Sequence, residues 1–355
     1  MSFDRRIGKI GSRRNKLGAG LCATAALGLL PWAGLSAAPA AASSSKVTIA
    51  FAQGYCGNTW RATMDNAFFT EAKQLEQAGM LSSYKYVCAN NSVSTQESQM
   101  ADFILEHPSV IVLDPTSSTA LNGEIARAVA AHIPVLVTDS GPVTSTLPYE
   151  LNAPNADLML TLDSYLAQRL HGKGNVLVVR GIAGNLAEQQ FYGATVSVFK
   201  KYPGIHVVGT VWGQWTDAIS EQAVAKVLSG LPSIQGVSQQ GGSYGVVEAF
   251  KAAGRPIPVI EGDNRGTFLK WWAAEHKLNG YTTLSAATNP GIGAADVYVA
   301  VQIADGKAVP KNMLMPILTI DQQQLPQYAG LPVTASASAV YPNSWYQKNI
   351  IGTGH

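Results

Sequence analysis

The stretch of residues 110–139 constrains the fold more than any other part of the sequence. It reads VIVLDPTSSTALNGEIARAVAAHIPVLVTD, in which two short apolar runs, Val110–Leu113 and Ile133–Val137, flank a helix-like segment. Uninterrupted apolar runs of this length are typical of parallel strands that are buried on both faces of a sheet. The stretch therefore predicts a strand, a crossover helix and a second, parallel strand. Ligands of such sheets bind beyond the carboxyl ends of the strands, where Asp114 and Asp139 stand in this sequence.

The same alternation of strands and helices recurs along the chain in two series. In the first, strand-like runs at residues 47–52, 84–87, 110–113 and 135–137 alternate with helical segments at about 60–78, 94–106 and 118–131. The second series begins near residue 155, and three prolines, Pro142, Pro148 and Pro154, mark the passage between the two as a linker. This order predicts an α/β fold with two doubly wound, parallel sheets.

The Asp-Pro-Thr at residues 114–116, the Ile-Pro-Val at 133–135 and the acidic Asp139 resemble the corresponding passage of the ribose-binding-like family of periplasmic solute-binding proteins. The resemblance covers roughly residues 46–320 and implies the type I periplasmic binding protein fold, with two lobes joined by a three-strand hinge. It implies one lobe from residues 46–151 plus 289–317 and a second from 152–288 plus 318–355. The tail, 321–355, is longer than the family requires, and its role stays unassigned.

The N-terminus has the order of an export signal. Ser12-Arg13-Arg14-Asn15-Lys16-Leu17 precedes an uncharged run and then small residues up to Ala42, which predicts a twin-arginine signal peptide at residues 1–42. A membrane anchor is the alternative. Cleavage after Ala42 removes six Lys and Arg residues and one Asp, so the formal charge changes from +2 to about −3. That is not the balance of a nucleic-acid-binding protein, and the mature chain is expected in the periplasm or at the cell exterior.

Two cysteines, Cys56 and Cys88, remain after the expected cleavage. An oxidising compartment makes a disulfide plausible, although two free buried thiols fit the sequence equally well. In the fold that the resemblance implies, the first two strands are neighbours, and each cysteine comes just after the end of one of them. We therefore expect a Cys56–Cys88 disulfide that braces the loop leading to Trp60.

The loop after the first strand offers Asn58-Thr59-Trp60-Arg61, where ribose-type family members carry an Asn-Pro-aromatic-aromatic motif. An indole face can stack on the C–H face of a sugar ring, and a guanidinium donates hydrogen bonds to hydroxyls or to a carboxylate. Asp139 matches the family's aspartate that accepts hydrogen bonds from sugar hydroxyls. The alternative is structural: Trp60 packs into the core, Arg61 lies in solvent and Asp139 caps a turn.

In the second series, Asp263 matches the family's second ligand-binding aspartate. Two positions depart from the ribose-binding pattern, because Gln189 stands where an arginine is expected and Gln239 stands where the family has Asn-Asp. Both changes argue against ribose itself. Trp215 directly follows a strand, and Asn289 either reaches the ligand or caps the next helix. The complete set of expected ligand-binding residues is Asn58, Trp60, Arg61, Asp139, Gln189, Trp215, Gln239, Asp263 and Asn289.

The sequence carries no pattern that supports catalysis, a metal site or a cofactor. No His pairs with a Ser or Cys in a nucleophile elbow, and no glycine-rich stretch completes a phosphate-loop motif. The resemblance implies a monomeric binding protein that captures a small sugar, sugar acid or polyol and delivers it to the transmembrane subunits of an ABC importer. A ligand receptor for a membrane sensor kinase is the alternative, and a secreted enzyme is less favoured.

Overall fold

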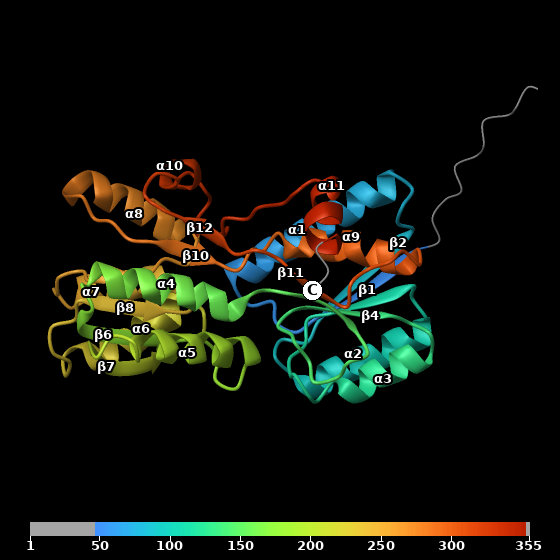
Figure 1. The fold of residues 1–355 in the computed structure, drawn as a ribbon, viewed down its shortest axis with the longest axis horizontal. Coiled ribbons are helices and arrows are strands. Elements are labelled where there is room, and N and C mark those ends of the chain that lie inside the picture. The colour runs from blue at the N-terminus through green and yellow to red at the C-terminus, as the bar shows by residue number, and fades with distance from the viewer. Residues whose placement is uncertain (1–46, 353–355) are drawn as a thin grey trace, which may run out of the picture. The chain divides into compact units, whose positions relative to one another are not determined.

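The computed structural model describes residues 47–352. The expected signal peptide, residues 1–42, lies outside these residues. Within the described chain, no helix is both long enough and apolar enough to cross a membrane. Figure 1 shows two groups of parallel strands, each with helices on both sides. The predicted α/β architecture with two parallel sheets is therefore confirmed.

The first sheet has six strands, and each is parallel to its neighbours. Their order across the sheet is β11 (Asn312–Leu314), β5 (Tyr149–Asn152), β4 (Val135–Asp139), β3 (Val110–Leu113), β1 (Thr48–Gln53) and β2 (Ser83–Cys88). Every residue of β3 and β4 is buried. This is why both strands appear in the sequence as unbroken apolar runs.

Helices cover both faces of this sheet, with α1 and α9 on one side and α2 and α3 on the other (Figure 1). Alternate residues of β1 serve the two faces: Ile49 and Phe51 pack toward α1 and α9, and Ala50 and Ala52 pack toward α2 and α3. The helix bounds are α1 (Thr59–Gln77), α2 (Val93–Glu106), α3 (Asn122–Ala130) and α9 (Ile292–Ala304). The carboxyl ends of the strands are thus held by a core on each face.

The second sheet repeats this construction. Its parallel strands run in the order β7 (Gly204–Trp212), β6 (Lys173–Arg180), β8 (Gly236–Gln239) and β9 (Val259–Ile260), and β10 (Ser285–Ala287) pairs antiparallel with β12 (Leu318–Ile320). Val176 and Val178 pack against α4 (Asn155–Arg169) and α5 (Leu186–Phe199). Leu177 and Val179 face α6 (Asp217–Leu228), α7 (Ser243–Ala252) and α8 (Gly266–Asn279).

The chain passes between the two sheets at four places, one more than expected: between β5 and α4, between β10 and α9, between β11 and β12, and again in the tail after Ala337. Strand β5 is absent from the sequence prediction, which treats this passage as a linker. Its four residues, YELN, give no apolar run, and the strand forms because both edges find partners, with Leu136 paired to Tyr149 and Asn312 paired to Glu150.

The tail contributes to both cores, so its assignment as a whole to the second lobe is wrong. Leu325, in α10 (Leu325–Tyr328), and Ala337 pack in the core of the second sheet. The chain then returns, and Tyr346, at the end of α11 (Asn343–Tyr346), packs with α9 in the core of the first sheet. The following π-helical turn, η1 (Gln347–Ile351), buries Ile350 and Ile351 in the same core. The apolar residues near the C-terminus explain this return, because packing in the core of the first sheet removes them from water.

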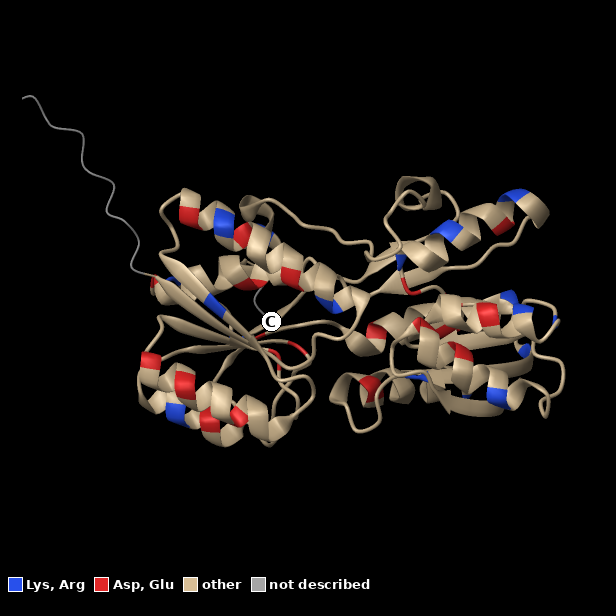
Figure 2. Ribbon diagram, turned by 180° about the vertical axis from the view of Figure 1, so that it is seen from behind, with Lys and Arg blue, Asp and Glu red and all other residues tan. Residues whose placement is uncertain are grey.

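Charged residues of both signs are interspersed over the helices of both sheets, as Figure 2 shows. Lys and Arg positions alternate with Asp and Glu positions and do not gather over one element. Over the part of the chain that the structure describes, the Lys and Arg positions form no continuous basic stripe.

Candidate ligand-binding site

A cavity of about 80 Å³ lies at the carboxyl ends of the strands, lined by residues from both sheets. This volume is well above the roughly 10–15 Å³ that is needed to admit a single water. The lining residues are Asn58, Trp60, Arg61, Asp139, Asn155, Leu158, Leu162, Ala187, Phe191, Trp215, Gln239, Gln240, Gly241, Asp263, Arg265, Ala286, Ala287 and Thr288.

The start of helix α1 places Trp60 and Arg61 at this cavity. Asn58 caps the helix, because its side-chain oxygen accepts a hydrogen bond from the backbone N–H of Arg61 at 2.9 Å. The indole Nε1 of Trp60 donates to the carbonyl oxygen of Thr288 at 2.7 Å. The guanidinium carbon of Arg61 lies 4.8 Å from the centre of the Trp60 ring. Both side chains are therefore fixed before any solute binds, with the indole still lining the cavity.

Arg61 belongs to a buried cluster of charges. Its Nη2 lies 2.7 Å from Oδ2 of Asp139 and 3.3 Å from Oδ2 of Asp114, and it donates to Oγ of Ser140 at 3.1 Å. Burial raises the pKa of Asp114 to about 6, although Arg61 opposes this shift. Burial alone would lower the pKa of Arg61, but Asp114 and Asp139 raise it above its usual value. The structural alternative of a solvated Arg61 is therefore wrong.

Asp139 ends β4 with a backbone φ of 53°, in the left-handed region. A non-glycine residue adopts this conformation at a cost, and such strain gathers at functional sites. The ion pair with Arg61 uses Oδ2, and Asp139 lines the cavity. Its second oxygen, Oδ1, stays outside this pair.

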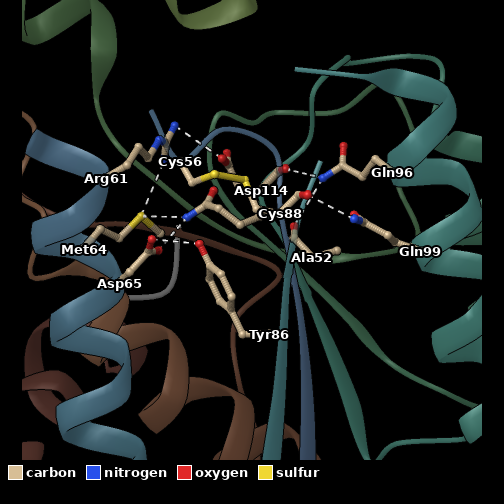
Figure 3. Close-up of a disulfide and its surroundings, with 11 residues drawn as sticks. Ala52, Cys56, Arg61, Met64, Asp65, Tyr86, Cys88, Gln96, Gln99 and Asp114 are labelled. Carbon is tan, nitrogen blue, oxygen red and sulfur yellow. Dashed lines mark hydrogen bonds and ion pairs between the residues drawn. A yellow bond between two sulfur atoms is a disulfide. The ribbon is translucent and has the colours of Figure 1, made fainter. Parts of the chain in front are cut away.

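The expected disulfide joins Cys56 and Cys88. In the register of β1 and β2, Gln53 pairs with Cys88, so the loops after the two strands leave the sheet side by side. Figure 3 shows the bridge and the glutamine side chains near it. Gln96 donates to the carbonyl oxygen of Asp114 at 2.7 Å, and Gln99 donates to that of Cys88 at 3.1 Å. These contacts hold the ends of β3 and β2, the two neighbours of β1, from which the chain leads to α1.

Trp215 forms the wall on the side of the second sheet. It has a φ of 57°, and its carbonyl oxygen accepts a hydrogen bond from Nη2 of Arg265 at 2.6 Å. The indole packs directly on Gly181, where an added Cβ would lie 2.2 Å from the indole Nε1. Gly181 is therefore required for the position of this ring.

Asp263 and Gln239 line the cavity and also hold its backbone. Asp263 Oδ2 accepts hydrogen bonds from the backbone N–H groups of Gly242 at 2.7 Å and of Ser243 at 3.2 Å. These are orphan donors at the start of α7, which a nearby carboxylate stabilises. Gln239 donates to the carbonyl oxygen of Glu261 at 2.9 Å and accepts from the N–H of Gly241. Both side chains therefore have a structural role, hydrogen bonding to the backbone, that the sequence analysis did not predict.

Two expected site residues do not line the cavity. Gln189 is exposed, and its amide donates to the carbonyl oxygen of Gly184 at 3.5 Å. Asn289 is buried, donates to the carbonyl oxygen of Ala339 at 2.8 Å and accepts from the N–H groups of Gly291 and Ala339 at 2.9 Å each. Of the two roles considered for Asn289, the structure shows the one at the helix start, and it adds a clamp on the tail.

The sequence analysis missed Asn155, Phe191, Gln240 and Arg265. Phe191 lies two positions after Gln189 on α5, and this places it on the buried face of that helix while Gln189 is exposed. Arg265 directly follows the Asp263-Asn264 pair, and that proximity is the one signal that pointed to it. Across residues 47–352, no group of three His, Cys, Asp or Glu side chains is arranged to hold a metal ion.

Comparison with known proteins tests the resemblance to periplasmic solute-binding proteins that the sequence shows. A sequence model of the family described as periplasmic binding protein domain matches residues 49–308. The chain is 28% identical over 279 residues to the xylitol-binding protein of Mycolicibacterium smegmatis. The aligned region covers 72% of this chain and 75% of that protein. The crystal structure of an ABC transporter solute-binding protein from Thermobispora bispora superimposes with a TM-score of 0.82 at 31% identity, over 87% of this chain and 97% of the other.

The fold alone is shared with a fructose-binding periplasmic domain of a hybrid two-component system, at 20% identity and a TM-score of 0.70, over 80% of this chain and 93% of the other. The family match covers most of the chain, and the family predicted from the sequence is confirmed. The chain therefore belongs to the periplasmic binding protein family, with the type I fold of the solute-binding proteins that serve ABC transporters.

Proposed function

We propose that this protein captures a small sugar or polyol in the cavity and delivers it to the transmembrane subunits of an ABC importer. The observation that carries the proposal is the chemistry of the cavity wall. Trp60, Phe191 and Trp215 supply apolar aromatic faces, and Asp139 supplies an oxygen outside its ion pair. Aromatic faces pack on C–H groups, and a carboxylate accepts strong hydrogen bonds from hydroxyls. A polyhydroxylated solute presents both kinds of group.

The relative that binds xylitol supports an open-chain polyol as a candidate. The departure at Gln239, which lines the cavity, from the ribose-binding pattern also argues against ribose. Neither Gln189 nor Asn289 is included in the proposed site. The proposed ligand-binding residues are instead Asn58, Trp60, Arg61, Asp139, Asn155, Phe191, Trp215, Gln239, Gln240, Asp263 and Arg265.

The protein works outside the cytoplasm in this proposal. A twin-arginine signal peptide at residues 1–42 directs export, cleavage follows Ala42, and the mature chain acts as a monomer in the periplasm or at the cell exterior. The disulfide supports this location, because such bridges persist in oxidising compartments.

In this proposal, binding closes two lobes about the segments that cross between them. One lobe comprises residues 46–151 and 289–317 together with the end of the tail, and the other comprises 152–288 and the first part of the tail. Closure of two lobes around a solute is a common mechanism of switching, and the closed form would present both lobes to the permease at a fixed spacing.

Delivery to a sensor kinase is the second candidate, favoured by the fold shared with the fructose-binding domain of a two-component system. A pull-down with the transmembrane proteins encoded beside its gene separates the two: an importer permease retains the solute-loaded protein in the first case, and a kinase sensor domain does so in the second. Catalysis is not part of the proposal, since the family and its neighbours are binding proteins.

A thermal-shift screen against pentoses, hexoses, alditols, inositols and nucleosides tests the function. A ligand present at 100 times its Kd stabilises the native state by about 2.7 kcal/mol, so a true ligand raises the Tm clearly. Solution scattering then measures closure, with a smaller radius of gyration expected in saturating ligand. A screen in which no sugar or polyol raises the Tm contradicts the proposal.

A further inference from the structure

We infer that the cavity selects uncharged polyhydroxylated solutes and rejects the matching carboxylates, so that an alditol binds and its aldonate does not. This inference rests on the proposed function and names the charge class of its ligand. It departs from the expectation drawn from the sequence, in which the Arg61 guanidinium serves a sugar acid as well as it serves a sugar.

The first observation is that Arg61 already has two carboxylate partners. Its Nη2 contacts Asp139 at 2.7 Å and Asp114 at 3.3 Å. The Arg61 and Asp139 side chains are each 9% exposed, and that of Asp114 is 2% exposed. The positive charge is thus neutralised inside the protein, where little water screens the pair. Arg61 lines the cavity and positions Asp139 through their ion pair. The guanidinium charge of Arg61 is therefore already paired and is not available to bind an anion.

The second observation is that Arg265, on the opposite side of the cavity, is neutralised in the same way. Its Nη1 lies 3.5 Å from Oδ2 of Asp263 and 3.8 Å from Oδ1 of Asp217. Its Nη2 donates to the carbonyl oxygen of Trp215. The Arg265 side chain is 7% exposed and that of Asp263 is 8% exposed. The two arginines, from different sheets, therefore share one arrangement.

The charge balance of the cavity follows from these pairs. Arg61 and Arg265 are the basic residues of the lining, and Asp139 and Asp263 are the acidic ones. Asp114 and Asp217 do not line the cavity, but each forms a second ion pair, Asp114 with Arg61 and Asp217 with Arg265. An incoming carboxylate would lose its water, meet no unpaired cation among these groups and lie near four carboxylates. A buried charge without a partner is strongly unfavourable.

An uncharged polyol meets the same groups on favourable terms. A hydroxyl both donates and accepts hydrogen bonds. It can donate to Oδ1 of Asp139, and it can accept from those guanidinium N–H groups of Arg61 and Arg265 that make no ion pair. The apolar part of the wall, including Trp60, Phe191 and Trp215, covers the carbon chain. The cavity thus binds hydroxyl groups through charged side chains in which each arginine is already paired with two carboxylates.

Matched pairs of solutes test the inference on the full-length protein. Xylitol and xylonate differ at one end of the chain, as do ribitol and ribonate, and calorimetry at pH 7.5 gives the affinity of each. We expect at least one alditol to bind and its aldonate to bind at least a hundredfold more weakly. An aldonate that binds as tightly as its alditol overturns the inference and leaves the proposed function standing. If no sugar, alditol or aldonate binds, the proposed function fails, and this inference fails with it.

A variant that unbalances the charges provides a second test. Asp114→Asn removes one of the two carboxylates of Arg61, and Asp114 does not line the cavity. The preference for an alditol over its aldonate should fall about tenfold. Asp217→Asn does the same for Arg265 at a half-buried position, and it serves if Asp114→Asn does not fold. Asp305→Asn, at an exposed position, is the matched control and should leave the preference unchanged. An unchanged preference in the folded Asp114 or Asp217 variant overturns the inference.

Discussion

Nη2 of Arg61, near the start of α1, lies 2.7 Å from Oδ2 of Asp139, at the end of β4. The two residues are far apart in the sequence, and the sheet brings them together because β1 and β4 end at the same edge, with β3 between them. The pair fixes one oxygen of Asp139 and leaves the other outside the ion pair. Asp139 therefore has a structural role in addition to the binding role that we propose for it.

The first prediction concerns Asp139→Asn. The variant keeps the shape of the side chain and loses the charge-assisted acceptor, so affinity for the solute should fall by about 1–3 kcal/mol, or roughly ten- to hundredfold. Stability should fall slightly, because Arg61 keeps Asp114 and Ser140 as partners. Calorimetry and thermal unfolding measure the two effects. Wild-type affinity in the folded variant would show that Asp139 does not touch the ligand.

The second prediction separates Asp263 from Asp139. Asp263→Ala removes the acceptor of two backbone N–H groups at the start of α7, so the unliganded protein should lose about 1–2 kcal/mol of stability. From the sequence alone, both aspartates would be expected to change affinity with little effect on the unliganded fold. Denaturant unfolding without ligand checks this, and a wild-type midpoint for Asp263→Ala would contradict the capping role.

The third prediction concerns the wall formed by Trp215. In Gly181→Ala, the new methyl group would overlap the indole of Trp215, so the ring must move and affinity should fall at least tenfold. Tryptophan emission should shift in the unliganded variant. Gly193→Ala is the control, because Gly193 lies in α5 with no atom within 4 Å of an added Cβ. Equal affinity in both variants would exclude Trp215 from the site.

The fold was accessible from the sequence because burial on both faces leaves a direct record in apolar runs. Strand β3 is predicted at the residues where the structure has it, Val110–Leu113. Strand β5 and the returning tail leave no such record. Their residues become ordered through partners that are distant in the sequence, such as Leu136 for Tyr149 and α9 for Tyr346. A local pattern cannot encode partners of this kind.

The site was accessible where a strand end fixes the position of a side chain. Asp139 ends β4, Trp215 and Asp263 come three residues after the ends of β7 and β9, Trp60 lies at the start of the helix that follows β1, and all four line the cavity. On a helix, the side that faces the cavity depends on the exact phase of the helix, and Gln189 is exposed where Phe191 lines the wall. The pairing of each arginine with two aspartates joins residues from separate loops, and only the folded chain reveals it.

A second buried pair of acids lies close to the cavity. Asp163, on α4, and Glu261, after β9, are both fully buried. Glu261 Oε2 accepts a hydrogen bond from the N–H of Gln239, a residue of the cavity lining, at 3.1 Å. Burial raises the pKa of Asp163 to about 6, and burial together with Asp163 raises that of Glu261 well above its usual value. The folded protein therefore keeps these protons to a higher pH than the unfolded chain does.

The fourth prediction follows from this pair and concerns the pH dependence of stability. The unfolded chain releases these protons near pH 4, and the folded chain holds them to higher pH. The stabilisation of the folded state by these protons is therefore fully present below about pH 4 and is lost as the pH rises through about 6. For Asp163 the loss is on the order of 2–3 kcal/mol, because each pKa unit corresponds to about 1.4 kcal/mol. Asp163→Asn removes the titration and keeps a neutral polar group. Its free energy of unfolding, measured with urea from pH 4 to 7, should decline less than that of the wild type, so the difference between the two should shift in favour of the variant as the pH rises. Asp305→Asn, at an exposed position, should run parallel to the wild type. Parallel curves for Asp163→Asn as well would mean that the pair is not protonated in the folded protein.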